Sequence, residues 1–163
     1  IKPLHVIALN NKGYTLKEFG RDKEALEYCD RAIKIDPRYV LPWYNKGDAL
    51  RHLGRYKKAL ECYTQGLKID PKDAHAWHNK GCVLGELGRY QKAIACYDKA
   101  LKINPKDANA WSNKGYTLRE LGKYRKALEC CDQALKINPK DDDAWHNKGY
   151  SLDELGKYKK ERE

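Results

Sequence analysis

Apolar residues recur along this chain at the spacing of an amphipathic helix, and glycine and proline interrupt them at regular points. In one stretch, Trp77, Leu84 and Leu87 fall on one face of a predicted helix. A glycine follows, and the apolar pattern resumes from residue 90 to residue 103. An Asn-Pro pair comes next, and proline cannot continue a helix. The pattern therefore predicts two helices joined by a short turn.

The same helical hairpin is predicted along the whole chain, because tryptophans, two sets of glycines and one set of prolines each recur every 34 residues. With the tryptophan as position 4, the repeats are 6–39, 40–73, 74–107 and 108–141, followed by a partial repeat at 142–163; residues 1–5 match the end of a preceding repeat. The glycine at position 15, Gly156 included, is expected to end each first helix. The last residues, with Glu161, are expected to begin a second helix with a polar finish.

With its period of 34 and its Trp, Gly, Ala, Tyr, Ala and Pro at fixed positions, the chain resembles the tetratricopeptide repeat family. The third repeat has all six signature residues: Trp77, Gly81, Ala93, Tyr97, Ala100 and Pro105. The resemblance implies an all-α, right-handed superhelical solenoid of antiparallel helix-turn-helix repeats. It also implies a scaffold for protein–protein interaction, with the first helices lining a concave groove. The sequence has no nucleophile–base pair, phosphate loop or paired carboxylates, so an enzyme is not expected.

Asparagine stands at position 6 of every repeat, on the helix side predicted to face the groove. These residues are Asn11, Asn45, Asn79, Asn113 and Asn147. An amide both donates and accepts hydrogen bonds, which suits the backbone of an extended peptide. The superhelix of the O-linked N-acetylglucosamine transferases is similar and uses such a ladder; the alternative is that these residues are solvated and bind nothing. The other expected peptide contacts are Tyr14, Tyr44, Asp48, His78, Tyr116, Arg119 and Tyr150.

The net charge of +10 raises the alternative of a nucleic-acid or acidic-surface partner. The predicted groove positions, however, hold three cations and seven anions, so the positive charge is expected at the rim. A charged rim is usually a solvated face, which disfavours specific nucleic-acid binding as the function. The lysine and asparagine of the co-chaperone carboxylate clamp are not matched, which disfavours an acidic chaperone tail as the ligand.

Three of the six cysteines, Cys62, Cys96 and Cys130, stand 34 residues apart, on helices too far apart for disulfides. Reduced thiols and a cytoplasmic location are therefore expected. The chain has no run of 18 apolar residues, so no membrane-spanning helix is expected.

Histidine and cysteine side chains share one face of the third repeat's first helix. His75, His78 and Cys82 have the spacing of three zinc ligands. There is no Cys-x-x-Cys pair and no obvious fourth ligand, so ordinary exposed side chains are the favoured interpretation. Neither a metal nor another cofactor is expected.

The fifth repeat is predicted to leave an apolar flank around Trp145, Leu152 and Leu155 only partly covered. Unpaired apolar faces seek partners, and a head-to-tail contact propagates rather than closes. We therefore expect a monomer with weak end-to-end self-association.

Overall fold

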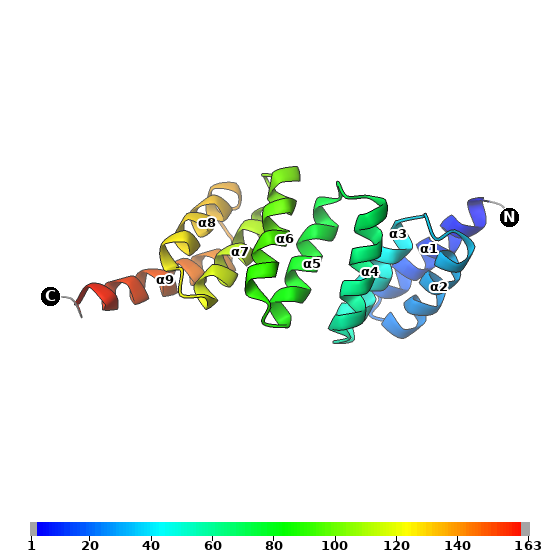
Figure 1. Cartoon of the computed structure of the whole chain (residues 1–163), viewed down its shortest axis with the longest axis horizontal. Helices are drawn as coiled ribbons and strands as arrows, with labels where there is room; N and C mark the ends of the chain where they lie inside the picture. The colour runs from blue at the N-terminus through cyan, green and yellow to red at the C-terminus, as the bar shows by residue number, and fades with distance from the viewer. Residues whose placement is uncertain (1–2, 161–163) are drawn as a thin grey trace.

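The structure is a computed structural model. It describes the backbone of residues 3–160 of the 163 and the side chains of residues 4–156. The described residues form nine α-helices and no strand (Figure 1). The helices are α1 (Pro3–Glu18), α2 (Asp22–Ile35), α3 (Leu41–His52), α4 (Tyr56–Ile69), α5 (Ala74–Glu86), α6 (Tyr90–Ile103), α7 (Ala108–Glu120), α8 (Tyr124–Ile137) and α9 (Asp142–Lys160).

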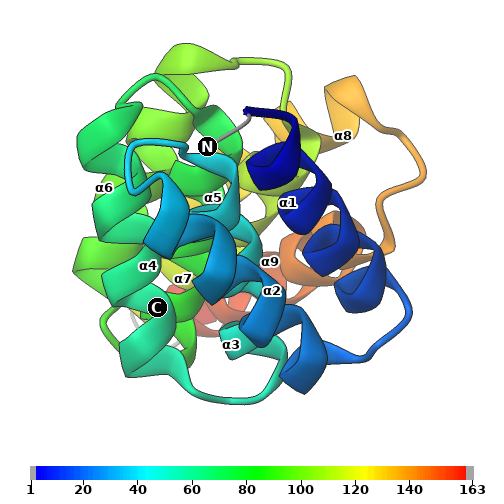
Figure 2. The ribbon, with the colours of Figure 1, turned by 90° about the vertical axis from the view of Figure 1, so that its right-hand side faces the viewer.

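The helices pair into antiparallel hairpins that stack along one long axis, with the two termini at opposite ends (Figure 1). Among the described residues, each helix contacts only helices one or two places away in the chain. Figure 2 shows that successive hairpins are rotated about the long axis rather than stacked in a flat row. The predicted all-α solenoid of helical hairpins is therefore confirmed.

Four glycines make the turn inside each hairpin. Gly20, Gly54, Gly88 and Gly122 have φ angles of 71°, 68°, 67° and 68°, in the left-handed region that glycine adopts without a steric penalty. Gly156 is different: it lies inside α9, so the prediction that it ends the first helix is wrong. A turn here would gain no contacts unless a second helix packed back on α9, whereas keeping glycine in a helix costs only about 1 kcal/mol. Glu161 lies outside the described residues.

The turns between hairpins are built around the repeated prolines, and the tryptophans hold them. The indole nitrogen of Trp43 donates to the carbonyl oxygen of Pro37 at 3.0 Å, and Trp77 makes the same bond to Pro71. An aspartate ends this turn before α5, α7 and α9; Asp73, for example, accepts a hydrogen bond from the backbone N–H of Ala76. Each tryptophan therefore fixes its helix to the turn before it.

The core is a row of small clusters between neighbouring helices, formed by leucines of the first helices and alanines of the second helices. Leu84 is 5% exposed and Ala93 is fully buried. The glycine at position 8 lets α6 approach closely, since a Cβ added at Gly81 would lie 2.6 Å from Cε1 of Tyr97. This packing supports the predicted role of that glycine.

The two ends of the array differ from its middle. The helix α1 begins at Pro3, so residues 3–5, which the sequence assigns to a preceding repeat, continue α1 instead of forming the turn seen at the other prolines. At the far end, Trp145 is 53% exposed and Leu152 is 52% exposed, whereas Leu118, at the same position as Leu152, is 5% exposed. The α9 flank predicted to be partly covered is indeed open at these two residues.

Candidate functional site

Two adjoining hollows are lined by α3, α5, α7 and α9, and we call the surface along the first helices of the repeats the groove. One part of it is lined by Arg51, His78, Asn79, Cys82, Asn109, Ser112, Asn113, Asp141 and Asp143, and the adjoining part by Asn113, Tyr116, Arg119, Asp143, His146 and Asn147. All these residues lie on α3, α5, α7 or α9, except Asp141, which immediately precedes α9. The sequence prediction of which helices and which positions form this surface agrees with these linings.

The asparagines at position 6 connect each repeat to the one before it. The Nδ2 atom of Asn45 donates to Oδ1 of Asn10 at 2.9 Å, and Nδ2 of Asn79 donates to Oδ1 of Asp48 at 3.0 Å. In the next repeat, Nδ2 of Asn113 lies 3.1 Å from Nε2 of His78. The nitrogen atoms of the three central rungs therefore already have partners within the protein.

The exposure of the asparagine side chains varies along the groove. Asn11 is exposed, whereas Asn79 and Asn147 are only 9% and 4% exposed. The buried rungs therefore present only a small part of the amide group to a ligand.

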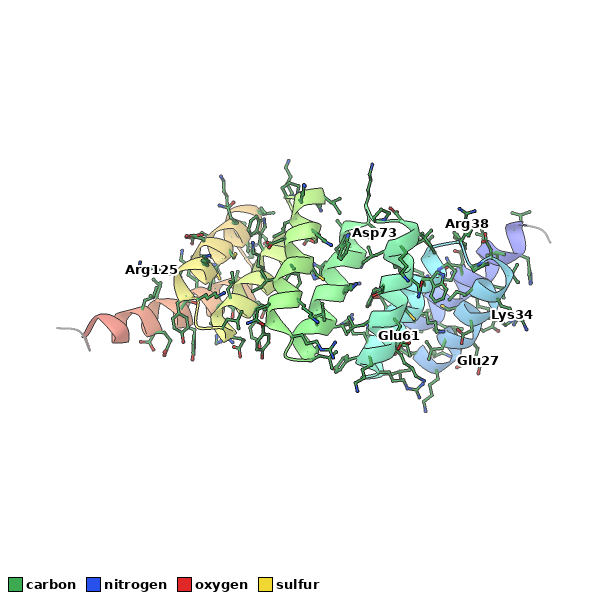
Figure 3. All side chains as sticks on the ribbon, in the orientation of Figure 1. Glu27, Lys34, Arg38, Glu61, Asp73 and Arg125 are labelled. Carbon is green, nitrogen blue, oxygen red and sulfur yellow. The ribbon has the colours of Figure 1, made fainter. Side chains whose placement is uncertain are left out.

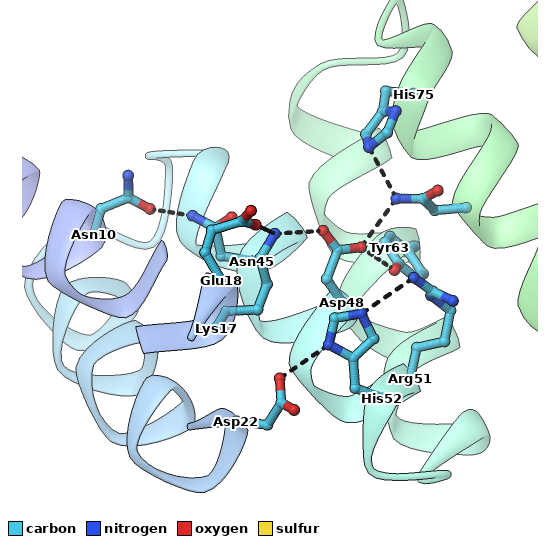
Figure 4. A network of polar contacts seen from close by, with 11 residues as sticks. Asn10, Lys17, Glu18, Asp22, Asn45, Asp48, Arg51, His52, Tyr63 and His75 are labelled. Atoms are coloured by element: carbon cyan, nitrogen blue, oxygen red, sulfur yellow. Dashed lines mark hydrogen bonds and ion pairs between the residues drawn. The ribbon is translucent and has the colours of Figure 1, made fainter. Parts of the chain in front are cut away.

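The carboxylate of Asp48 is the centre of a polar network that fills the groove between α1, α3 and α5 (Figure 4). Its Oδ2 lies 3.2 Å from Nζ of Lys17, and its Oδ1 accepts hydrogen bonds from the hydroxyl of Tyr63 and from Nδ2 of Asn79. Nε2 of His75 lies 3.2 Å from the same Nδ2 atom of Asn79. The aspartate is 8% exposed, so a partner in the groove would meet a closed network here.

The electrostatics of this network follow from burial and pairing. Burial alone would lower the pKa of Lys17, but the nearby carboxylates of Asp48 and Glu18 outweigh it and raise that pKa above its ordinary value. Burial, followed by the charge of Asp48, raises the pKa of the Tyr63 hydroxyl. Lys17 is therefore charged and Tyr63 neutral at physiological pH, which is the combination that satisfies the aspartate.

His78 links α5 to the turn before α7. Its Nδ1 lies 3.3 Å from Oδ2 of Asp107, and its ring meets the Tyr97 ring edge-on with centroids 5.8 Å apart. Burial lowers the pKa of His78, and the charge of Asp107 opposes this change without reversing it. The neutral ring can then donate to Asp107 through Nδ1 and accept from Asn113 through Nε2.

Two exposed tyrosines flank an arginine at the C-terminal part of the groove. The guanidinium of Arg119 lies 4.7 Å from the ring centroid of Tyr116 and 4.8 Å from that of Tyr150. It also pairs with Glu120 at 2.7 Å. Tyr116 and Tyr150 are 40% and 47% exposed, so this stack presents aromatic surface that a partner side chain can cover.

The two predicted tyrosine contacts at the N-terminal part have opposite surroundings. Tyr14 is 48% exposed, with the ammonium of Lys17 over its ring. Tyr44 is buried: its ring covers Gly66, and its hydroxyl donates to the carbonyl oxygen of Asp70. The prediction of Tyr44 as a groove contact is therefore corrected, because the glycine at position 27 of this repeat leaves space that the ring fills.

The structure does not assemble His75, His78 and Cys82 as metal ligands. No group of three or more His, Cys, Asp or Glu side chains arranged to hold a metal occurs among the described residues. Each of the three already has a hydrogen-bond partner: Asn79 for His75, Asp107 for His78, and Asn113 for the sulfur of Cys82 at 3.5 Å.

The cysteines are free thiols packed between helices. Burial raises the pKa of Cys62 and of Cys130 to about 11, so these thiols stay protonated and unreactive at neutral pH. No helix of the described part is long and apolar enough to cross a lipid bilayer.

The charged residues away from the groove are spread over the outer surface. Glu27, Glu61 and Arg125, on the second helices, are exposed (Figure 3). The lysines at position 7 reach back to the second helix of the preceding repeat: Lys114 pairs with Asp98 at 2.7 Å, and Lys148 with Asp132 at 2.7 Å. Part of the positive charge is therefore neutralised by contacts that join the repeats.

Sequence reasoning missed two features of the groove. The first is that the amides of the ladder are bonded across repeats. The second is Ser112, which is 5% exposed and lines the groove beside Asp141. The sequence does contain a signal that Ser112 differs from its equivalents. Serine stands here where the repeats on either side have a histidine, His78 and His146.

Comparison with known proteins identifies the repeat unit. The tetratricopeptide repeat family matches residues 6–39, 40–73, 74–107 and 108–141, and a second tetratricopeptide repeat profile matches residues 130–163. No curated protein matches the chain.

Many solved structures share the fold. A crystal structure of MamA has a TM-score of 0.83 at 22% identity, covering 88% of this chain and 84% of MamA. MamA (41-end) from Desulfovibrio magneticus RS-1 has a TM-score of 0.86 at 23% identity, covering 96% and 88%. YrrB, described as a TPR protein with an unusual peptide-binding site, has a TM-score of 0.80 at 23% identity, covering 97% and 79%. At these identities the likeness concerns the fold alone.

Proposed function

This chain belongs to the tetratricopeptide repeat family, and we propose that it is a protein-interaction scaffold that holds an extended peptide segment in its groove. The family and the fold support a protein-interaction scaffold in general. The groove and the asparagine ladder as the place of binding are the specific part of the proposal. The peptide-binding site attributed to YrrB supports a peptide as the class of partner for this fold.

The observation that carries the proposal is the orientation of the ladder amides. The Nδ2 atoms of Asn45, Asn79 and Asn113 all bond to the preceding repeat, which fixes which end of each amide is already used. These bonds use the nitrogen and not the Oδ1 atom of each amide. A row of carbonyl oxygens can accept from the backbone N–H groups of a peptide.

The spacing of the rungs fits an extended chain. Neighbouring packed helices lie about 8–10 Å apart, and an extended peptide rises about 3.3 Å per residue. One asparagine would therefore meet about every third peptide residue. Such contacts recognise the backbone, so sequence preference has to come from the side chains around the ladder.

The test is peptide binding by fluorescence anisotropy, with labelled peptides selected from a random library against the folded chain. Asn113→Ala should weaken a groove-bound peptide about three- to tenfold, the effect of one hydrogen bond. The matched control is Gln91→Ala, which removes an exposed amide from the second helix α6 and should leave affinity unchanged. Equal loss in both variants, or none in either, would contradict binding through the ladder.

Salt dependence distinguishes this function from nucleic-acid binding through the rim. Nucleic-acid affinity falls steeply with salt because counterions are released from the phosphates. Affinity that depends on backbone hydrogen bonds should change little between 50 and 200 mM salt. The salt dependence of peptide binding and that of oligonucleotide binding are measured on the same protein, with a labelled oligonucleotide as the second probe.

A further inference from the structure

Two equivalent junctions between repeats differ in how position 5 of one repeat meets the aspartate that ends the same repeat. At the junction of the third and fourth repeats, Nδ1 of His78 lies 3.3 Å from Oδ2 of Asp107. At the next junction the same two positions hold Ser112 and Asp141. Serine is too short to span the distance that the histidine ring spans. Ser112 Oγ and Asp141 Oδ2 are both covered, and neither has a hydrogen-bond partner.

The buried, unsatisfied side-chain atoms of the described residues all belong to residues that line one part of the groove. Among the described side chains, three buried nitrogen or oxygen atoms have no hydrogen-bond partner: Arg51 Nε, Ser112 Oγ and Asp141 Oδ2. All three residues line the same part of the groove, together with Asn113 and Asp143. A buried polar atom without a partner costs free energy, so a ligand that bonds to these atoms is favoured by that amount.

The charge of the lining indicates what the ligand is. Asp141 and Asp143 lie at one end of this part of the groove, and Asp143 is exposed. Asp107, by contrast, already has His78 as its partner. A carboxylate oxygen accepts hydrogen bonds and never donates while ionised, so the group that satisfies Asp141 has to be a donor and is best positively charged.

We propose that this part of the groove is a subsite for one lysine or arginine residue of the bound peptide. The cationic head binds the carboxylates of Asp141 and Asp143 and the hydroxyl of Ser112, and the backbone carbonyl of the same residue accepts from Nε of Arg51. Because Asp141 Oδ2 is covered, Asp143 makes the first contact and the walls adjust as the head enters. This assignment rests on the proposed function, since it takes the peptide in the groove as given.

The experiment starts from a random library of twelve-residue peptides, selected for binding to the folded wild-type chain. The best binders are then resynthesised with each lysine replaced by norleucine and each arginine by citrulline, which keep the length and remove the charge. One basic residue should be shared by the binders, and its neutral replacement should weaken binding about tenfold or more.

Variants of the chain locate that residue. Asp141→Asn removes the charge but keeps an N-cap, because asparagine can replace the aspartate that accepts from the backbone N–H of Ala144. It should reduce the preference for the charged over the neutral peptide several-fold, with Asp143 supplying what remains. The matched control is Asp73→Asn, which alters the same N-cap position before α5 and should leave the preference for the charged peptide intact.

Ser112→His separates binding from folding. It places at this junction the residue that pairs with aspartate at the preceding one, so the side chain should bond to Asp141 and fill the subsite. We expect the basic residue of the peptide to lose its contribution while the thermal unfolding midpoint stays the same or rises. A merely structural role for Ser112 would not give loss of charge preference with retained stability.

Every outcome decides the proposal. A preference for the basic residue that Asp141→Asn reduces and Ser112→His abolishes, and that Asp73→Asn keeps, supports the subsite. Binders that contain no common basic residue, or whose preference survives both variants, overturn the subsite and leave peptide binding in place. If the library yields no peptide whose affinity falls with Asn113→Ala, the proposed function fails and the subsite fails with it.

Discussion

The N-terminal and C-terminal parts of the groove have the same backbone and opposite chemistry. Between α1, α3 and α5, the carboxylate of Asp48 has partners from three directions, which satisfy both of its oxygen atoms. Between α7 and α9, Ser112 Oγ and Asp141 Oδ2 have no partner, and Tyr116 is 40% exposed. The first part is closed by the protein itself, and the second is the part that a ligand can complete.

The difference shows that the repeat fold alone does not determine the chemistry of the groove. Positions 5, 9 and 34 fall at corresponding places in each repeat, so the backbone alone does not tell the two parts apart. Side-chain length does: His78 reaches its aspartate, and Ser112 does not. A single residue therefore decides whether this contact between repeats is made or leaves buried polar atoms without a partner.

The largest expected effect comes from breaking the closed part. Asp48→Ala removes the acceptor of the Tyr63 hydroxyl, and leaves Lys17 with only Glu18 and Asn79 Nδ2 with only His75 as a partner. Removing one partner of a buried charged pair costs about 3–5 kcal/mol of stability. Urea unfolding followed by circular dichroism measures it.

The control for Asp48→Ala is Tyr116→Ala, which changes the same position of the fourth repeat, on the open part. Because Tyr116 is exposed, its removal should cost less than about 1 kcal/mol. Similar costs for the two variants would show that the closed and open parts do not differ as the structure indicates.

The next largest effect is expected where the first helix of a repeat packs against its second helix. Gly81→Ala would place a Cβ 2.6 Å from Tyr97, and such overpacking costs about 1–3 kcal/mol. Gly149→Ala, at the same position of α9, meets nothing within 4 Å and should stabilise the helix by up to about 1 kcal/mol. Thermal unfolding of both variants gives the comparison. Opposite signs are expected, and a stabilising Gly81→Ala would contradict the close approach of α6.

A smaller effect is expected from pH at the boundary between the two parts. Burial lowers the pKa of His78 in the folded chain, with Asp107 opposing and Arg51 and His75 reinforcing the change. The unfolded chain then binds more protons, so stability present above the ordinary pKa of histidine falls as the pH drops through about 6.5 and below. His78→Gln should reduce this fall between pH 7.5 and 5.5, whereas His146→Gln, at the exposed equivalent position, should not. Unfolding midpoints at each pH are the measurement.

The weakest effect concerns the two ends of the array. Trp145 and Leu152 on α9, and Leu4 and Phe19 at α1, are large apolar side chains that are more than half exposed. We expect weak head-to-tail association that grows with protein concentration, and with salt because salt screens the repulsion between chains of charge +10. Sedimentation velocity tests this. A monomer at every protein and salt concentration would show that these side chains do not drive association.

The sequence by itself determined the helices, the hairpin turns and the choice of groove-lining positions. These features depend on local spacing. Glycine marks the turn where φ is positive, and proline marks the end of the second helix. The leucines and the asparagines fall on opposite sides of each first helix. The same local rule was wrong at Gly156, which lies inside α9.

Only the tertiary structure decided which groove residues are already bonded. Asn79 and Asp48 are 31 residues apart, and Ser112 and Asp141 are 29 apart, so their distances depend on how one hairpin packs against the next. Helical periodicity gives the direction of a side chain and cannot tell whether a partner from another repeat lies within hydrogen-bond distance. For that reason the sequence predicted a uniform ladder, while the packed repeats give one closed part and one open part.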